Sequence, residues 1–188
     1  QSFILTNEKK QAVSYLSKFS TLTRTILEMS EKENITLSEE IKTLGLYLDI
    51  EKARFDEDFN YEINIGYGVD IENIKIPSML LQPYVENAVK HGLLHKKGEK
   101  KLTIDFERVF DSLKITIDDN GIGRQKSAEL NAIKNKDHSS FATEAMQNRI
   151  ALLNQYKQNN IAINFEDKYN KNKQSLGTKV IIEIPITY

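Results

Sequence analysis

An alternating segment that ends in a carboxylate is the feature that most constrains this chain. Apolar and polar side chains alternate along residues 113–119, which predicts a β-strand with one buried face. That face carries Leu113, Ile115, Ile117 and then Asp119. A buried carboxylate is unfavourable unless a donor binds it, and the exocyclic amine of a purine is such a donor. The glycines at 121 and 123 would let a ligand approach the backbone closely. The alternative is an aspartate that opens an ordinary Asp-Asn-Gly turn.

A second polar pattern lies upstream of this strand. The periodicity of residues 77–94 predicts a helix with Pro77 in its first turn. Its apolar face consists of Leu81, Tyr84, Val85 and Ala88. Asn87, Lys90 and His91 form a neighbouring polar stripe, because side chains three and four positions apart lie on one side of a helix. An amide oxygen beside an ammonium suits a magnesium triphosphate, since magnesium prefers oxygen ligands and phosphate is anionic. Taken alone, the stripe is also typical of a solvated helix face.

Together the two patterns resemble a known family. The segment from Pro77 to Gly92, with the sequence PSMLLQPYVENAVKHG, resembles the asparagine box of LytS-like sensor histidine kinases. Their ATP-binding domain has the Bergerat fold. Asp119 to Gly123 resembles the adenine box of that family, and Gly177-Thr178 resembles its last glycine box. The segment from Phe3 to Phe55 resembles the helical dimerisation region, so the resemblance covers nearly the whole chain.

The resemblance implies a role for each matching residue. Asn87 would coordinate magnesium, Lys90 would contact the phosphates, and Asp119 would bind the adenine amine. Further nucleotide contacts would come from His91, from Gly121 and Gly123 at the lid hinge, from Arg149 in the helix after the lid, and from Gly177 and Thr178. Glu86 is a candidate base, although an α-helix turns its side chain away from that of Asn87. The implied cofactors are ATP and magnesium.

The remaining pattern predicts an α+β fold, a two-layer α/β sandwich with helices on one face of a mostly antiparallel sheet. Strands are predicted at 59–65, 101–108, 112–119, 161–166 and 178–186, and helices at 77–94 and 143–157. The polar stretch between Gly123 and Thr143 would be the lid over ATP, or surface disorder. We expect this catalytic ATP-binding domain to span residues 57–188.

Residues 1–56 predict a partial helical hairpin for dimerisation and phosphotransfer. Heptad-like stripes run through Ala12, Leu16, Phe19, Thr23 and Ile26, and through Leu37, Ile41, Leu44, Leu48, Glu51 and Phe55. Thr36 and Glu39 are spaced as a capping box. Narrow stripes bury little surface by themselves, so we expect a homodimer through these helices, with Leu16, Phe19, Leu44 and Leu48 at the seam. The alternative is a hairpin that packs on its own catalytic domain.

Composition agrees with an intracellular signalling fragment. The chain has 188 residues, a formal net charge of −1 and no cysteine. A near-zero charge gives no electrostatic case for nucleic-acid binding, and the lack of cysteine excludes a disulfide framework. No stretch approaches the length of a membrane span. The sequence starts without methionine, so we expect the cytoplasmic portion of a membrane sensor, with membrane segments and phosphate acceptor upstream.

Two departures from the family pattern carry information. The glycine-rich run that often closes the lid is replaced by Ser139-Ser140-Phe141-Ala142-Thr143. The acceptor histidine of related kinases lies in a His-Phe-x-Phe-Asn segment, and none of the three histidines has that context. We therefore expect binding of Mg-ATP, transfer of the γ-phosphoryl group to an upstream histidine, and relay to the receiver domain of a response regulator.

Two other functions remain open. The first is a Bergerat-fold ATPase, but the position where that class carries a catalytic glutamate is Pro83 here. The second is a degenerate module that binds nucleotide or dimerises without catalysis. The altered lid segment favours the degenerate module, and the intact Asn87 and Asp119 speak against it.

Overall fold

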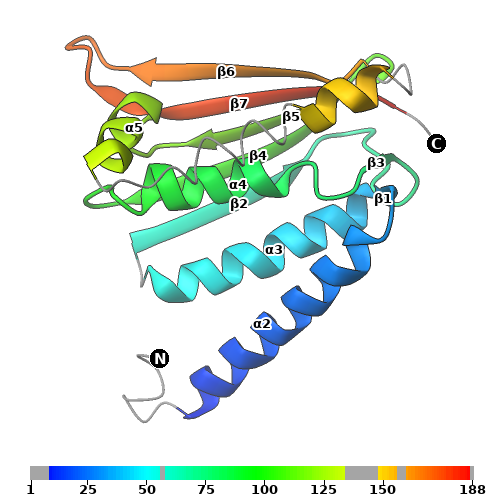
Figure 1. Cartoon of the computed structure of the whole chain (residues 1–188), viewed down its shortest axis with the longest axis horizontal. Coiled ribbons are helices and arrows are strands. Elements are labelled where there is room, and N and C mark those ends of the chain that lie inside the picture. Colours follow the sequence, from blue (N-terminus) through cyan, green and yellow to red (C-terminus); the bar gives the residue numbers. More distant parts are fainter. Residues whose placement is uncertain (1–8, 56–57, 134–147, 156–159, 187–188) are drawn as a thin grey trace.

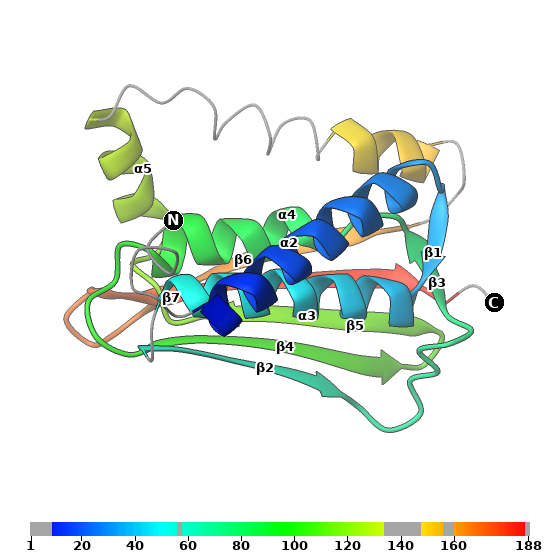
Figure 2. The ribbon, with the colours of Figure 1, turned by 90° about the horizontal axis from the view of Figure 1, so that it is seen from below.

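The computed structural model describes residues 9–55, 58–133, 148–155 and 160–186, and helices cover one face of a five-stranded sheet (Figures 1 and 2). The strand order is β2-β4-β5-β7-β6. The strands are β2 (Phe59–Ile65), β4 (Lys100–Val109), β5 (Ser112–Asp119), β6 (Ala162–Tyr169) and β7 (Ser175–Pro185). β2 pairs with β4 in parallel, whereas β4–β5, β5–β7 and β6–β7 are antiparallel. The predicted α+β two-layer sandwich with a mostly antiparallel sheet is therefore confirmed.

The strand predictions hold for the main sheet and miss a small one. β2 and β5 have the predicted bounds, and the other three strands overlap their predicted ranges. A separate two-stranded sheet joins β1 (Asn34–Thr36) to β3 (Lys75–Pro77) in antiparallel fashion. Three residues are too few to show a period of two, so the sequence carried no signal for these strands.

The N-terminal hairpin consists of α2 (Lys9–Ser30) and α3 (Leu37–Arg54). The predicted capping box starts α3: the Glu39 backbone N–H donates to Thr36 Oγ1 at 3.2 Å, and the Thr36 backbone N–H donates to Glu39 Oε2 at 2.8 Å. Two backbone donors that the first helical turn leaves without a partner are thereby satisfied. The helix consequently begins at a position that the sequence defines locally.

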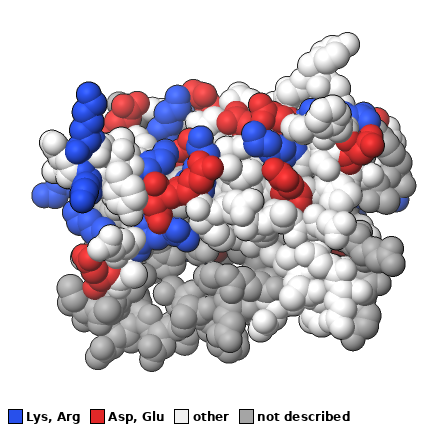
Figure 3. Space-filling model, turned by 90° about the horizontal axis from the view of Figure 1, so that it is seen from above, with Lys and Arg blue, Asp and Glu red and all other residues white. Residues whose placement is uncertain are grey.

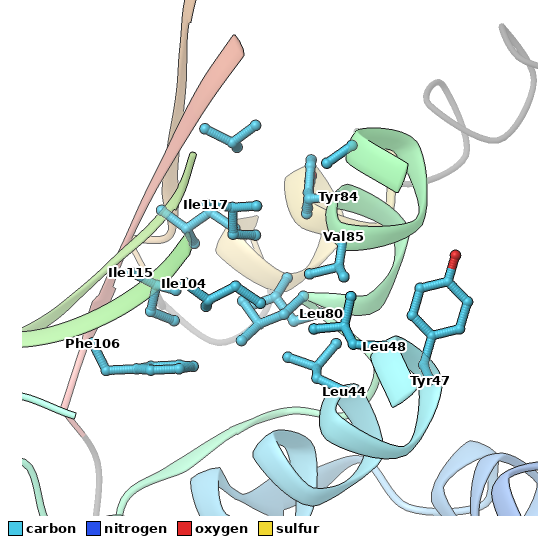
Figure 4. Packing of buried hydrophobic residues seen from close by; sticks show 14 of the residues in the cluster. Leu44, Tyr47, Leu48, Leu80, Tyr84, Val85, Ile104, Phe106, Ile115 and Ile117 are labelled. Atoms are coloured by element: carbon cyan, nitrogen blue, oxygen red, sulfur yellow. The ribbon is translucent and has the colours of Figure 1, made fainter. Parts of the chain in front are cut away.

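The apolar stripe of α3 belongs to the core of the domain. Figure 4 shows Leu44 and Leu48 of α3 pointing toward Leu80, Val85 and the side chains of the sheet. Leu44 and Leu48 are both 0% exposed. Their predicted place at an intersubunit seam is therefore wrong, because the same chain already covers them. For α3, the alternative reading of a hairpin packed on its own domain is correct, and the boundary between residues 56 and 57 stays a prediction.

The predicted α-helix at 77–94 is wrong in its start and partly in its type. Pro77 ends β3, and Met79 has a φ of 55°, so the chain turns before the helix begins. α4 spans Gln82–Asn87, with Pro83 in its first turn, and continues as the π-helix η2 (Ala88–Leu93). Proline fits the first helical turn because backbone N–H groups there have no intrahelical acceptor, so the lack of an N–H costs no hydrogen bond. Pro83, rather than Pro77, has that position.

The segment after the adenine-box glycines also differs from the expectation of a polar loop. α5 (Arg124–Ile133) begins directly after Gly123, and the Ser127 backbone N–H donates to the Gly123 carbonyl at 3.1 Å. Its Gln, Lys, Ala, Glu and Leu residues are good helix formers, although they lack an apolar stripe. Residues 134–147, including the altered lid segment, lie outside the described residues. Residues 148–155 are helical, in agreement with part of the predicted helix 143–157.

Charges of both signs are mixed over the face that carries β6. Figure 3 shows Lys and Arg side chains interspersed with Asp and Glu on this face. Arg124 on α5 and Asp167 on β6 form an ion pair, with Arg124 Nε and Nη2 donating to the two carboxylate oxygens at 2.8 and 2.7 Å. This bidentate pair ties the start of α5 to the sheet.

Candidate functional site

Asp119 ends β5 with its carboxylate buried, as its place on the apolar face predicted. The residue is 4% exposed. The Gly121 backbone N–H donates to Asp119 Oδ1 at 2.7 Å, and the Thr178 backbone N–H is a second donor to this carboxylate. The first contact is the local bond of an Asp-Asn-Gly turn. The turn interpretation and the buried-carboxylate interpretation are therefore both correct.

Three glycines pack around Asp119 without room for a side chain. A Cβ on Gly121 would lie 2.5 Å from the Gly92 carbonyl carbon, and a Cβ on Gly177 would lie 2.0 Å from the Asp119 carbonyl oxygen. Gly177 also has a φ of 113°, which L residues rarely adopt. A Cβ on Gly92 would meet Asp119 Oδ1 at 3.0 Å. Close packing of backbone on backbone around Asp119 therefore requires glycine at positions 121 and 177.

Hydrogen bonds fasten the adenine-box turn to the end of η2. The Ile122 backbone N–H donates to the Gly92 carbonyl at 3.1 Å, and Lys96 Nζ donates to the Asn120 carbonyl at 2.5 Å. Asn120 Oδ1 in turn accepts the Lys101 backbone N–H at 2.8 Å, at the start of β4. Sequence reasoning assigned no role to Lys96 or Asn120. The Asp-Asn-Gly turn marked Asn120, whereas no pattern marked Lys96.

Burial dominates the electrostatics of Asp119. Desolvation raises the pKa of its carboxyl from an ordinary 3.8 to about 6, against the opposing effect of the Gly121 and Thr178 N–H groups and the Lys168 charge. The charged form is thus under-stabilised by the protein alone. An added hydrogen-bond donor at this carboxylate would favour ionisation, which is the property expected of a ligand site.

The burial of Asp119 should make the stability of the ligand-free protein depend on pH. A folded-state pKa above the unfolded value means that the folded chain holds more protons between about pH 4 and 6, so stability falls as pH rises through this window. From the shift to about 6, Asp119 should contribute a loss of about 2 kcal/mol between about pH 4.5 and pH 7. Urea unfolding of the parent and of Asp119→Asn at both pH values isolates this term, because Glu40, whose burial raises its pKa to about 7, titrates in both proteins. A stability difference between the two proteins that does not change with pH contradicts the prediction.

The predicted polar stripe lies along α4 and η2. Asn87 is half-buried at the end of α4, and Lys90 and His91 lie in η2. Lys90 Nζ donates to Glu86 Oε2 at 2.5 Å. Burial, followed by the charges of Lys90 and His95, lowers the pKa of His91, so its imidazole is neutral at pH 7. A π-helical turn between Asn87 and His91 changes their relative direction from that on an α-helix, and such turns are frequent at functional sites.

A buried carboxylate fixes the start of α4. Glu40 of α3 is 1% exposed, and its Oε1 accepts the Leu81 backbone N–H at 2.9 Å, with Met79 and Gln82 as further backbone donors. An anion at a helix N-terminus is stabilised by the free N–H groups there. This contact orients the helix that carries Asn87, and no sequence pattern indicated it.

The structure brings most, though not all, of the predicted site residues together. Asp119, Gly121 and the strand segment Gly177-Thr178 are in contact, and a Cβ on Gly123 would meet Ser175 Oγ at 2.0 Å. The Asn87 helix joins them through Gly92. Arg149 is apart: its Nη2 donates to the Ser78 carbonyl at 2.6 Å, on the N-terminal side of α4, whereas Asn87 is at the opposite end.

Two kinds of structural feature are absent from the described part of the chain. Groups of three or more His, Cys, Asp or Glu side chains that could hold a metal ion are absent from that part. Within the same residues, no helix has the length and apolar character to span a bilayer.

Sequence comparison finds sensor histidine kinases. A family model described as histidine kinase matches residues 1–59. The chain is 32% identical to the sensor histidine kinase BtsS of Escherichia coli K12 over 117 residues, which are 62% of this chain and 20% of BtsS. It is 28% identical to YpdA of the same organism over 177 residues, 94% of this chain and 28% of YpdA. LytS of Staphylococcus epidermidis is 30% identical over 118 residues, 62% of this chain and 19% of LytS. The chain thus spans less than a third of the length of each of these relatives.

Structure comparison agrees on the fold. A histidine kinase domain of a blue-light activated kinase from Erythrobacter litoralis EL346 aligns with a TM-score of 0.56 and 14% identity, over 95% of this chain and 81% of that domain. The histidine kinase AdeS of Acinetobacter baumannii aligns with a TM-score of 0.54 and 14% identity, over 98% of this chain and 85% of that one. The chain is therefore a relative of the LytS-like sensor histidine kinases and has the fold of histidine kinase catalytic domains.

Proposed function

We propose that this chain binds Mg-ATP and transfers its γ-phosphoryl group to a histidine that precedes residue 1 in the full protein, for relay to a response regulator. The observation that carries the proposal is the buried Asp119 carboxylate inside a cradle of glycines, directly beside the helix with Asn87 and Lys90. The relationship to sensor histidine kinases supports the same reaction class. Each part of ATP has a chemically suitable partner in this arrangement.

The surroundings of Asp119 suit an adenine base. Its carboxylate can accept a hydrogen bond from the exocyclic amine, which would supply the donor that the protein alone does not provide in full. Gly92 borders the carboxylate, while Gly121 and Gly177 pack against the backbone of Gly92 and of Asp119. We therefore assign purine recognition to Asp119, with Gly121, Gly123, Gly177 and Thr178 shaping the pocket. For Arg149, bound to Ser78, direct contact with nucleotide remains a proposal from family resemblance alone.

Magnesium would be shared between protein and nucleotide. The side-chain oxygen of Asn87 is a neutral ligand for this hard cation, and the phosphates and water would supply the other ligands. Lys90, and His91 beside it, would add donors for phosphate oxygens. Magnesium bound in this way would supply positive charge opposite the transferring phosphoryl group. The chain's own residues contribute position and charge, since proximity alone removes much of the barrier in such transfers.

The hydrolytic and degenerate alternatives are weaker. An ATPase of this fold class needs a carboxylate to activate water, and Pro83 occupies the corresponding position one turn before Asn87. A module that only dimerises would not need Asn87, Lys90 and Asp119 together, and one that only binds nucleotide would not transfer its phosphoryl group. Transfer of radiolabel from γ-labelled ATP to the full protein, as acid-labile and base-stable phosphate, separates the kinase from both alternatives.

ATP affinity should depend on magnesium through Asn87. Asn87→Ala removes one oxygen ligand, and we expect roughly a tenfold loss of ATP affinity in the presence of magnesium, equivalent to one hydrogen bond to a charged group. In the presence of EDTA the parent and the variant should bind ATP equally. Isothermal titration calorimetry under the two conditions measures both values. An equal loss with and without magnesium would assign Asn87 to packing and not to the metal.

We further propose that the protein is a homodimer through α2, within the cytoplasmic portion of a membrane sensor. Leu16 and Phe19 are 54% and 53% exposed, and Val13 and Leu27 on the same helix are also exposed. Such side chains gain by burial against a partner helix. These four residues, and not Leu44 and Leu48, would form the seam.

Charge placed in this seam should dissociate the dimer. We expect Leu16→Glu to raise the dimer dissociation constant at least roughly tenfold, since an unpaired carboxylate would be buried at the interface. Sedimentation equilibrium of the 188-residue chain measures the constant. Leu152→Glu, at a residue with 53% exposure on the helix 148–155, is the matched control and should not change it. A parent that remains monomeric at high concentration contradicts the dimer.

A further inference from the structure

Glu86 is held by two donors of different kinds, one turn to either side. Gln82 Nε2 donates to Glu86 Oε1 at 3.0 Å, and Lys90 Nζ donates to Glu86 Oε2 at 2.5 Å. Gln82 is 6% exposed, whereas the Lys90 side chain is 49% exposed. The surroundings of a buried amide hold it in place, whereas a half-exposed lysine carries its charge on a flexible side chain. The Gln82 contact is therefore the fixed one, and the Lys90 contact is exchangeable.

Lys90 has two possible anionic partners if nucleotide binds as proposed. In this structure its ammonium pairs with Glu86, in an i,i+4 ion pair of the kind that contributes little to helix stability. Magnesium triphosphate offers several charged oxygens to the same ammonium, and charge-assisted contacts to phosphate are stronger than ordinary hydrogen bonds. Binding of nucleotide would therefore draw Lys90 away from Glu86.

The charge of Glu86 acts on a residue of the N-terminal hairpin. The α3 residue Tyr47 is buried, and burial together with the charges of Glu51 and Glu86 raises the pKa of its phenol. Glu51 is itself bound by Arg54 Nη1 at 2.9 Å. Figure 4 places the Tyr47 hydroxyl at the edge of the core, directed away from the sheet side chains. The carboxylate of Glu86 is thus near both the Lys90 stripe and the hairpin.

We propose that Lys90 and Glu86 form a charge latch that Mg-ATP opens, and that the released Glu86 is the base of the transfer reaction. This inference rests on the proposed function. With Lys90 on phosphate, Oε1 stays held by Gln82 and Oε2 becomes free. As one imidazole nitrogen bonds to the γ-phosphorus and the bond from phosphorus to the ADP oxygen breaks, Oε2 accepts the proton of the other ring nitrogen. Gln82 is the positioning residue for this carboxylate.

The latch predicts that removal of the Glu86 charge increases the affinity for Mg-ATP. Glu86→Gln frees Lys90, so it should tighten Mg-ATP binding roughly two- to fivefold. Adenosine affinity should not change, because adenosine carries no phosphate. In a Lys90→Met background the gain should disappear. Glu107→Gln, which breaks the Glu107–Lys114 pair on the sheet, is the matched control for loss of one negative charge and should have no effect.

Calorimetry on these variants distinguishes failure of the proposed function from failure of the latch. Failure of the parent to bind Mg-ATP overturns the proposed function. Binding by the parent, with Lys90→Met weaker and Glu86→Gln unchanged, overturns the latch and leaves the function intact.

The base is tested by transfer in the full-length protein. At saturating ATP, Glu86→Gln should lower the initial rate of histidine labelling roughly 100-fold, the usual contribution of a positioned base, although its ATP affinity is higher. Gln82→Ala should lower the same rate without a change in KM for ATP, with thermal unfolding as the check on folding. A parental labelling rate in Glu86→Gln excludes Glu86 as the base.

Discussion

Asp119→Asn should lose ATP affinity by roughly 10- to 150-fold, while the protein stays folded. The replacement keeps the shape of the side chain but exchanges one acceptor oxygen for a donor, which cannot accept from the adenine amine. The loss of a hydrogen bond to a charged group corresponds to about 1.5–3 kcal/mol. Because Asp119 is 4% exposed, solvent cannot substitute for the lost partner. Isothermal titration calorimetry with Mg-ATP measures the change.

Two controls make this result specific. Asp105→Asn removes a carboxylate from the neighbouring strand β4, where its partner is Asn64 Nδ2 at 2.8 Å, and should leave ATP affinity unchanged. Lowering the pH of the parent below about 6 should also weaken binding, since protonation of Asp119 removes the acceptor, and Asp119→Asn should lack this dependence. Equal ATP affinity in Asp119→Asn and the parent refutes the assignment of adenine recognition to this residue.

Leu48→Ala should destabilise the folded chain by about 2–5 kcal/mol, whether or not the chain dimerises. Leu48 is 0% exposed and packs between α3 and the layer formed by α4 and the sheet (Figure 4). Truncation removes buried methyl groups and leaves a cavity, and both effects reduce stability. Urea unfolding at a protein concentration that keeps the chain monomeric measures the free energy of unfolding.

The comparison variant for this result is Leu152→Ala. Leu152 is 53% exposed on the helix 148–155, so the same truncation should change the free energy of unfolding by less than about 0.5 kcal/mol. If Leu48→Ala instead dissociated a dimer and left the monomer as stable as before, Leu48 would belong to an intersubunit seam after all.

The elements that the sequence predicted well are those with a local sequence pattern. Strand β5 was recognisable because Leu113, Ile115 and Ile117 alternate with polar residues over its full length, and Asp119 continues the buried face. The start of α3 was recognisable because its capping box involves residues only three positions apart. Family resemblance predicted that the Asn87 segment and the Asp119 segment belong to one site. Periodicity alone does not predict this.

Heptad spacing, in contrast, does not identify the surface that a stripe covers. Leu16 and Leu44 have the same spacing signal, yet Leu16 is exposed on α2 and Leu44 is buried under α4. The hydrophobic effect depends on the apolar area removed from water, so a partner subunit and the chain's own domain can stabilise the same side chain equally. The choice between them required the position of α3 in the fold.

By itself, the sequence determined the strands of the five-stranded sheet, the capped start of α3, the buried face of Asp119 and the residues of the Asn87 stripe, because local spacing encodes these features. Only the tertiary structure decided that α4 begins at Gln82, where Glu40 of α3 accepts its first backbone donors. It also placed Arg149 on Ser78, away from Asp119, and Gln82 and Lys90 on either side of Glu86. The contacts of Glu40 and Arg149 join residues far apart in the chain, and their energies depend on burial, which no short sequence pattern records.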